Sequence, residues 1–349
     1  MTMSNDPDEE FLVRVGISLL AARRYYDDGH PEHHRLALIL LDGAAESLLR
    51  RLVNENEMWF SFGELMAGQN AEAATLGLDQ PHVVHDMTFP SDLVSEGAYG
   101  EPVHLSRTQR RKLDKEFGPN ADVAVFFRRL SRDEAKALKH LHEYRNGAYH
   151  RNVLNLRTVG VLVQLQLSVV VSLLRATPQA PTTRIYPPID WEPMREVLGL
   201  PPGSPVSYRV FADILERGID LTGDEVSEIL GGNLRDRLVQ VKRRIGDIRE
   251  QMAVPGVTFE DWVALVQTPQ PWPVGTAEIR SHTPAVTLQQ LELWETASVT
   301  RAESDTALRA FGRFADVDSS LTGLEDAIEA VEIQLDREIQ RLIDERRGK

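Results

Sequence analysis

Residues 153–176 read VLNLRTVGVLVQLQLSVVVSLLRA, the most apolar stretch of the 349-residue chain. Asn155, Arg157, Gln164 and Gln166 interrupt this stretch. A helix that crosses a bilayer needs about 20 consecutive, predominantly apolar residues. The stretch therefore predicts a helix buried in a protein core rather than a membrane span, and no membrane is expected among the partners.

Helical periodicity also dominates the segments before this stretch. Ser131 and Glu134 have the spacing of a capping box at a helix start. Residues 68–104 are rich in Gly, Pro, Asp and His and indicate a long loop or an insertion. The predicted helices cover residues 10–26, 31–53, 106–117, 121–130 and the segment from Ser131 to about Gly147. We expect an all-α fold, with a helical bundle at residues 1–176, because no alternating strand pattern is present.

The second half of the chain has a different organisation. Residues 177–206 are dense in proline and predict a linker, followed by a helical, coiled-coil-like domain at residues 207–349. Capping boxes are expected at Thr222/Glu225 and Thr322/Glu325. Apolar residues at alternating spacings of four and three form two seams: Leu234, Leu238, Val241, Ile245, Ile248 and Met252, and then Leu321, Leu324, Ile328, Val331 and Leu335. Such seams either pack on each other as a long antiparallel hairpin or pair with another chain, and the periodicity does not distinguish the two.

Composition excludes several classes of chemistry. The chain has no cysteine, so a disulfide framework, a thiolate nucleophile and an iron–sulfur cluster are ruled out. No phosphate-binding loop, dinucleotide fingerprint or nucleophile elbow is present, and no cofactor is expected. The scattered histidines lack the spacing of a zinc site, so no metal is expected either. The polar, acidic start MTMSNDPDEE does not fit a targeting peptide, and a cytoplasmic protein is expected.

Charge is distributed unevenly in this acidic chain, whose net charge is −14. Residues 177–349 carry a net charge of −10, whereas residues 104–151 hold 12 basic and 6 acidic residues. A basic segment in an acidic protein is either a solvated helix face or a local site for an anion such as phosphate.

The string HLHEYRNGAYHRN at residues 140–152 lies in this basic segment and combines Arg145, Asn146 and His150. Arginine stays protonated and presents a fork that suits phosphate. Histidine titrates near neutral pH and transfers protons. Together they suffice for metal-independent RNA cleavage, in which the ribose 2′-OH attacks the phosphate.

The geometry of a helix restricts how Arg145 and His150 can act on one phosphate. Residues five apart on a straight helix lie about 140° apart around the axis. Arg145 and His150 therefore converge only if the backbone bends, which Gly147 favours, or if two copies of the chain meet at a dimer axis.

This motif and its helical context resemble the HEPN superfamily (higher eukaryotes and prokaryotes nucleotide-binding). Arg145, Asn146 and His150 match its Arg-x(4–6)-His pattern with a polar residue after Arg, and residues 36–53 resemble its early core helix. The resemblance covers residues 10–176. It implies a helical bundle and a metal-independent endoribonuclease with a composite site across a homodimer. It also implies roles in toxin–antitoxin pairs, antiviral defence or RNA processing, with RNA, including tRNA, as substrate and an antitoxin or defence protein as partner.

Residue roles follow from this interpretation. His150 is the predicted acid/base, Arg145 stabilises phosphate charge and Asn146 positions the phosphate or His150. Lys139, Tyr149 and Arg151 are the predicted substrate-binding residues, although Tyr149 also suits packing.

Two questions stay open at this level. Asp42 and Glu46 lie on one helix face and form either solvated pairs or a support for His150 or Arg145. The alternative function is a non-catalytic helical scaffold of the same family, which the acidity of the second half favours.

One HEPN subgroup carries a His-x-Tyr ending whose tyrosine is modified by a partner enzyme. Here His150 is followed by Arg151 and Asn152, which does not fit that mode of regulation.

Overall fold

The computed structural model describes residues 7–79, 82, 84–86, 103–151, 156–178, 190–252, 254–268, 282–296 and 306–348. Helices dominate these ranges, which confirms the predicted all-α class. The chain divides into two compact units, Met1–Leu221 and Thr222–Lys349, called unit 1 and unit 2 below.

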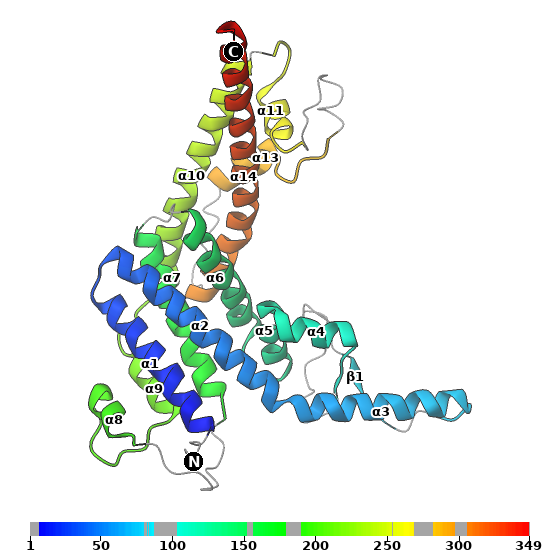
Figure 1. The fold of residues 1–349 in the computed structure, drawn as a ribbon, viewed down its shortest axis with the longest axis vertical. Coiled ribbons are helices and arrows are strands. Elements are labelled where there is room, and N and C mark those ends of the chain that lie inside the picture. Colours follow the sequence, from blue (N-terminus) through cyan, green and yellow to red (C-terminus); the bar gives the residue numbers. More distant parts are fainter. Residues whose placement is uncertain are drawn as a thin grey trace. The chain divides into compact units, whose positions relative to one another are not determined.

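Unit 1 is a helical bundle built around α2 and α7. Its helices are α1 (Pro7–Asp27), α2 (Pro31–Glu55), α3 (Glu57–Thr75), α4 (Arg107–Lys115), α5 (Phe117–Phe126), α6 (Arg132–Arg151), α7 (Leu156–Ala176), α8 (Glu192–Leu198) and α9 (Tyr208–Glu216). Helix α2 contacts α1, α5, α6 and α7, and α7 contacts α6 and α9 as well (Figure 1). The apolar faces of α2 and α7 therefore form the core of the bundle, as their periodicity predicts.

Helix α7 is the described helix that is long and apolar enough to cross a membrane, over Thr158–Ala176. In unit 1, however, 67% of this segment is buried by neighbouring helices. Leu162, Leu165 and Leu173 are almost fully buried, and so is Gln166. The helix occupies the place of a core helix in the bundle, in line with the prediction.

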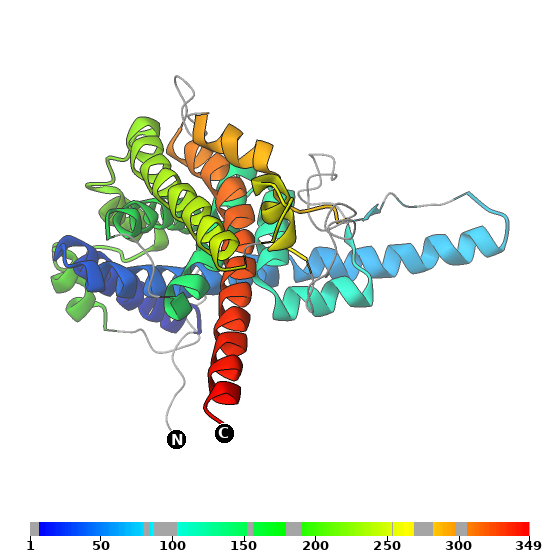
Figure 2. The same ribbon diagram turned by 90° about the horizontal axis from the view of Figure 1, so that it is seen from above.

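The segment predicted as a loop at residues 68–104 contains more structure than its composition indicates. Helix α3 continues to Thr75 and extends away from the other helices of unit 1 (Figure 1, Figure 2). Strand β1 (His85–Asp86) pairs in parallel with β2 (Val103–His104). The backbone of β2 lies directly on Gly63, where an added Cβ would stand 2.0 Å from the carbonyl oxygen of Val103. Contact with the backbone of β2 therefore supports α3, although the sequence of residues 68–104 has no clear helical pattern.

The boundary between the two halves also differs from the prediction at residue 207. Helix α9 packs against α7 and α1 and so belongs to unit 1, which ends at Leu221. The amphipathic sequence of α9 buries Tyr208, Phe211 and Leu215 in this interface. Within the predicted linker, the described residues include the short helix α8.

Unit 2 consists of α10 (Gly223–Met252), α11 (Phe259–Leu265), α13 (Leu288–Thr296) and α14 (Ala307–Arg346). The two predicted seams pack on each other within this unit. Arg237 binds Glu325 and Arg244 binds Glu332, so both partners advance by seven residues together. Helices α10 and α14 are therefore parallel, which corrects the antiparallel hairpin (Figure 1).

A buried ionic cluster sets the register of these two helices. Arg237 of α10 donates to Glu325 at 2.7 and 2.9 Å, to Thr322 Oγ1 at 2.9 Å, and to Asp318. Thr322 and Glu325 thus bind Arg237 in the middle of α14 and do not form the predicted cap. The helix begins at Thr306, whose hydroxyl accepts from the Arg309 amide. Burial alone would lower the pKa of Arg237, but the charges and hydrogen bonds of Glu325 and Asp318 outweigh it and raise the pKa above its ordinary value.

Replacing Arg237 with Ala is expected to destabilise unit 2 by about 2–4 kcal/mol, because Asp318 and Glu325 would lose their counter-charge in a largely buried position. Arg243→Ala is the matched control on the same helix, where an exposed pair with Asp247 contributes about 0–1 kcal/mol. Hydrogen exchange of α10 and α14 peptides along a urea series measures both changes. Equal shifts in the two variants would contradict the role of the cluster.

Candidate active site

Helix α6 carries most of the predicted site residues. It starts with the predicted capping box: Glu134 Oε2 accepts from the Ser131 amide at 2.7 Å, and the Ser131 hydroxyl accepts from the Glu134 amide at 3.2 Å. The helix then continues without interruption to Arg151 and passes through Gly147. The backbone bend that would let Arg145 and His150 converge within one chain is therefore not formed.

A buried carboxylate on α2 forms the centre of the site. Asp42 is fully buried (0% exposed) on the apolar face of this helix, beside Leu38, Leu41 and Ala45. A carboxylate in such surroundings requires charged or hydrogen-bonding partners. His142 Nδ1 lies 3.0 Å from Asp42 Oδ1, and Arg145 Nε lies 3.2 Å from Asp42 Oδ2. Asp42 therefore holds two side chains of α6 through its two oxygens.

The ring of His142 is held from a second side. Phe117, the first residue of α5, stacks on it with 4.1 Å between ring centroids and 2° between the planes. On the previous turn of α6, Lys139 donates to Asp122 of α5 at 2.6 Å. Asp122 is itself buried, so the Lys139 charge has a structural partner. Helices α2 and α5 thus fix the orientation of the α6 side chains between them.

Helix α4 leads directly to Phe117 and is strongly basic. Four of its side chains, Arg107, Arg111, Lys112 and Lys115, are exposed and are called the α4 basic face below. The remaining arginine, Arg110, pairs with Glu57 and Glu64 of α3. Exposed positive charge therefore lies on α4, just before Phe117, whose ring stacks on His142.

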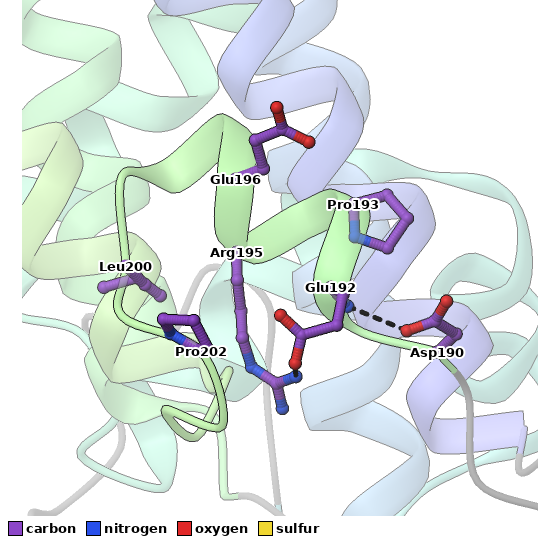
Figure 3. A pocket seen from close by; sticks show the side chains of 7 residues that line it. All are labelled: Asp190, Glu192, Pro193, Arg195, Glu196, Leu200 and Pro202. Atoms are coloured by element: carbon purple, nitrogen blue, oxygen red, sulfur yellow. Dashed lines mark hydrogen bonds and ion pairs between the residues drawn. The ribbon is translucent and has the colours of Figure 1, made fainter.

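Helix α8 and the turn after it form a pocket of about 410 Å³ elsewhere in unit 1 (Figure 3). Its lining includes three carboxylates, from Asp190, Glu192 and Glu196. Its one basic side chain, Arg195, binds Glu192 at 2.5 Å and the Ser204 carbonyl at 2.7 Å. None of the predicted site residues lines this pocket, and its negative charge does not suit an anionic substrate.

The structure answers the open question about the two acidic residues of α2. Asp42 pairs with Arg145, whereas Glu46 forms a solvent-facing pair with Arg50 at 2.7 Å. The side chains of Asn146, Tyr149, His150 and Arg151 lie outside the described residues. In the part of the chain that the structure describes, no three His, Asp or Glu side chains gather as metal ligands.

His142 is the residue of this site that sequence reasoning missed. The predicted pattern directed attention to the histidine five residues after Arg145. His142 precedes Arg145 by three residues, and residues three apart share a helix face. The presence of Asp42 on an otherwise apolar helix face was the second available signal.

No family model, no curated protein and no solved structure matches the chain.

Asp42→Asn is expected to destabilise unit 1 by about 2–4 kcal/mol, because it removes the buried negative charge that His142 and Arg145 face. Glu46→Gln, one turn further on the same helix, provides the control, since its exposed pair contributes about 0–1 kcal/mol. Urea denaturation of the two variants measures the difference. A loss no larger in Asp42→Asn than in Glu46→Gln would show that Asp42 does not organise the bundle.

Proposed function

We propose that the protein is a metal-independent endoribonuclease of the HEPN type, which cleaves RNA by attack of the ribose 2′-OH. The observation that carries the proposal is the position of Arg145. A fully buried carboxylate, Asp42, holds this guanidinium in α6, three residues after His142 and five before His150. An arginine and histidines on one helix are the groups needed to stabilise a phosphorane-like transition state and to transfer protons.

The distribution of charge supports an RNA substrate at this position. The α4 basic face lies on the segment that ends at Phe117, which stacks on His142. Phosphate groups of an RNA strand would release counterions on binding these side chains. The rest of the chain is acidic, with a net charge of −10 over residues 177–349, and repels RNA. Residues 104–151, with 12 basic and 6 acidic residues, are therefore the segment whose charge suits RNA.

A homodimer is part of this proposal. Because α6 is helical through Arg151, Arg145 and His150 of one chain lie about 140° apart around its axis. Two copies would supply the two groups to one phosphate across a twofold axis. The proposed biological setting is the cytoplasm, where such an enzyme acts as a toxin or antiviral effector on RNA such as tRNA, controlled by an antitoxin or a defence-system partner.

A second candidate function is a non-catalytic scaffold. The ion pair between Arg145 and Asp42 favours it, because an arginine that already neutralises a buried carboxylate has a structural reason for its position. The cleavage experiment distinguishes the two functions.

Purified wild-type protein in EDTA is expected to cleave total RNA or tRNA and to leave 2′,3′-cyclic phosphate ends. His150→Ala and Arg145→Ala are each expected to lower the rate by about 10²–10⁴-fold, through loss of proton transfer and of charge stabilisation. His140→Ala is the control, since His140 faces Glu143 at 3.5 Å and not Asp42. Absence of cleavage by the wild type would favour the scaffold, and equal cleavage by wild type and His150→Ala would place the activity elsewhere.

The α4 basic face is expected to contribute to binding of the RNA backbone. The double variant Arg111→Ala with Lys112→Ala should reduce the slope of log Kd against log salt concentration by about 1.4, because each lost contact to single-stranded RNA contributes about 0.7. Arg337→Ala with Arg341→Ala removes two exposed charges from α14 and is the matched control. Fluorescence anisotropy with a labelled oligonucleotide measures the slopes. An unchanged slope in the α4 variant would exclude this face from the RNA path.

A further inference from the structure

His142 has the environment of a proton-transfer group, which the motif of Arg145 and His150 leaves unused. Along the continuous helix α6, His142 and Arg145 lie about 60° apart around the axis and share a face. Both contact the same buried carboxylate, Asp42. Within one chain, the histidine next to Arg145 is therefore His142.

The contact with Asp42 defines the chemistry of the imidazole. Its Nδ1 lies 3.0 and 3.1 Å from the two carboxylate oxygens. Because an ionised carboxylate only accepts hydrogen bonds, this contact favours the tautomer with the hydrogen on Nδ1. A carboxylate that binds one ring nitrogen in this way leaves Nε2 as the proton acceptor and stabilises the imidazolium that forms. The parallel Phe117 ring fixes the plane of the imidazole. The His142 side chain remains 22% exposed.

Three other described histidines lack this combination. His33 binds Asp28, whose carboxylate is half exposed. His34 stacks on Tyr26 and faces a backbone carbonyl through Nε2. His140 faces the exposed Glu143 on its own helix. Of these four described histidines, His142 is the one whose ring nitrogen contacts a buried carboxylate and whose face is covered by an aromatic ring.

We infer that His142 is the general base of the cleavage reaction, an inference that rests on the proposed endoribonuclease function. Nε2 of His142 removes the proton from the ribose 2′-OH, the bond between O2′ and phosphorus forms, and the bond between phosphorus and O5′ breaks. His150 gives its proton to the departing O5′, and Arg145 stabilises the charge on the phosphate. The products are a 2′,3′-cyclic phosphate and a 5′-hydroxyl, and no redox change occurs.

The two histidines then come from different copies of the chain. Residues 142 and 150 lie eight positions apart on α6, which is about 12 Å along the helix axis. On a single helix, this separation and the angle of about 140° between Arg145 and His150 keep the proposed acid off the face of Arg145. His142 and Arg145 of one copy would act with His150 of the second copy.

The test separates a base from an acid by changing the leaving group. Asn at position 142 keeps an N–H donor for Asp42 and cannot carry the proton. His142→Asn is expected to cleave an ordinary RNA oligonucleotide about 10²–10⁴-fold more slowly than wild type. The same loss should appear with a substrate that has sulfur in place of O5′, because a thiolate leaves without protonation but the 2′-OH still requires a base. The deficit of His150→Ala, in contrast, should largely disappear with the sulfur substrate.

Each other outcome overturns the assignment in a recognisable way. Wild-type activity in His142→Asn, together with loss in His150→Ala, would remove His142 from catalysis and leave the endoribonuclease standing. Recovery of His142→Asn on the sulfur substrate would make His142 the acid. No cleavage by wild type would overturn both the inference and the proposed function.

A measurement on the wild-type protein covers the case in which His142→Asn does not fold. Long-range ¹H–¹⁵N NMR spectra of histidine-labelled protein report the tautomer of each ring. We expect the Nδ1–H tautomer for His142. The Nε2–H tautomer would mean that Nε2 cannot accept the 2′-OH proton, and would overturn the assignment.

Discussion

The organisation of unit 1 depends on one buried negative charge. Asp42 is fully buried on the core helix α2, and a carboxylate there is tolerated only with polar or charged partners. His142 and Arg145 provide them from one face of α6, and Phe117 extends the arrangement to α5. The same contacts that satisfy the carboxylate also bring an arginine and a histidine together at a partly exposed surface. The buried carboxylate of Asp42 therefore determines both how α6 packs on α2 and where His142 and Arg145 lie.

Unit 2 uses a related constraint for a different purpose. Arg237 on α10 bridges Asp318 and Glu325 on α14, and Arg244 repeats the contact with Glu332 one heptad later. Replacing such buried pairs with apolar residues is often neutral for stability, but breaking one partner is costly. A sliding apolar seam does not distinguish between registers, whereas these ion pairs permit only one. Charge thus specifies the register that the heptad pattern leaves undetermined.

Local signals in the sequence predicted the parts of the fold that are stabilised locally. The all-α class, the capping boxes at Ser131/Glu134 and Thr222/Glu225, and the buried seams all depend on residues within one or two helical turns. The parallel direction of α10 and α14 and the extent of α3 depend on contacts between distant segments. Thr322 and Glu325 show the difference: their spacing fits a cap, but Arg237, 85 and 88 residues away, binds both.

At the candidate site, too, the sequence pattern alone does not determine which side chains lie together. The motif identifies Arg145 and His150 as neighbours in the sequence. The continuous helix α6 determines which of its residues share a face. That geometry pairs Arg145 with His142. In the mechanism we propose, it assigns His150 to a second copy of the chain. In the proposed mechanism, one bundle positions the base, whereas the acid comes from the second copy in the dimer. If the proposal holds, a partner that blocks the dimer would leave the Asp42, His142 and Arg145 cluster intact while it prevents cleavage.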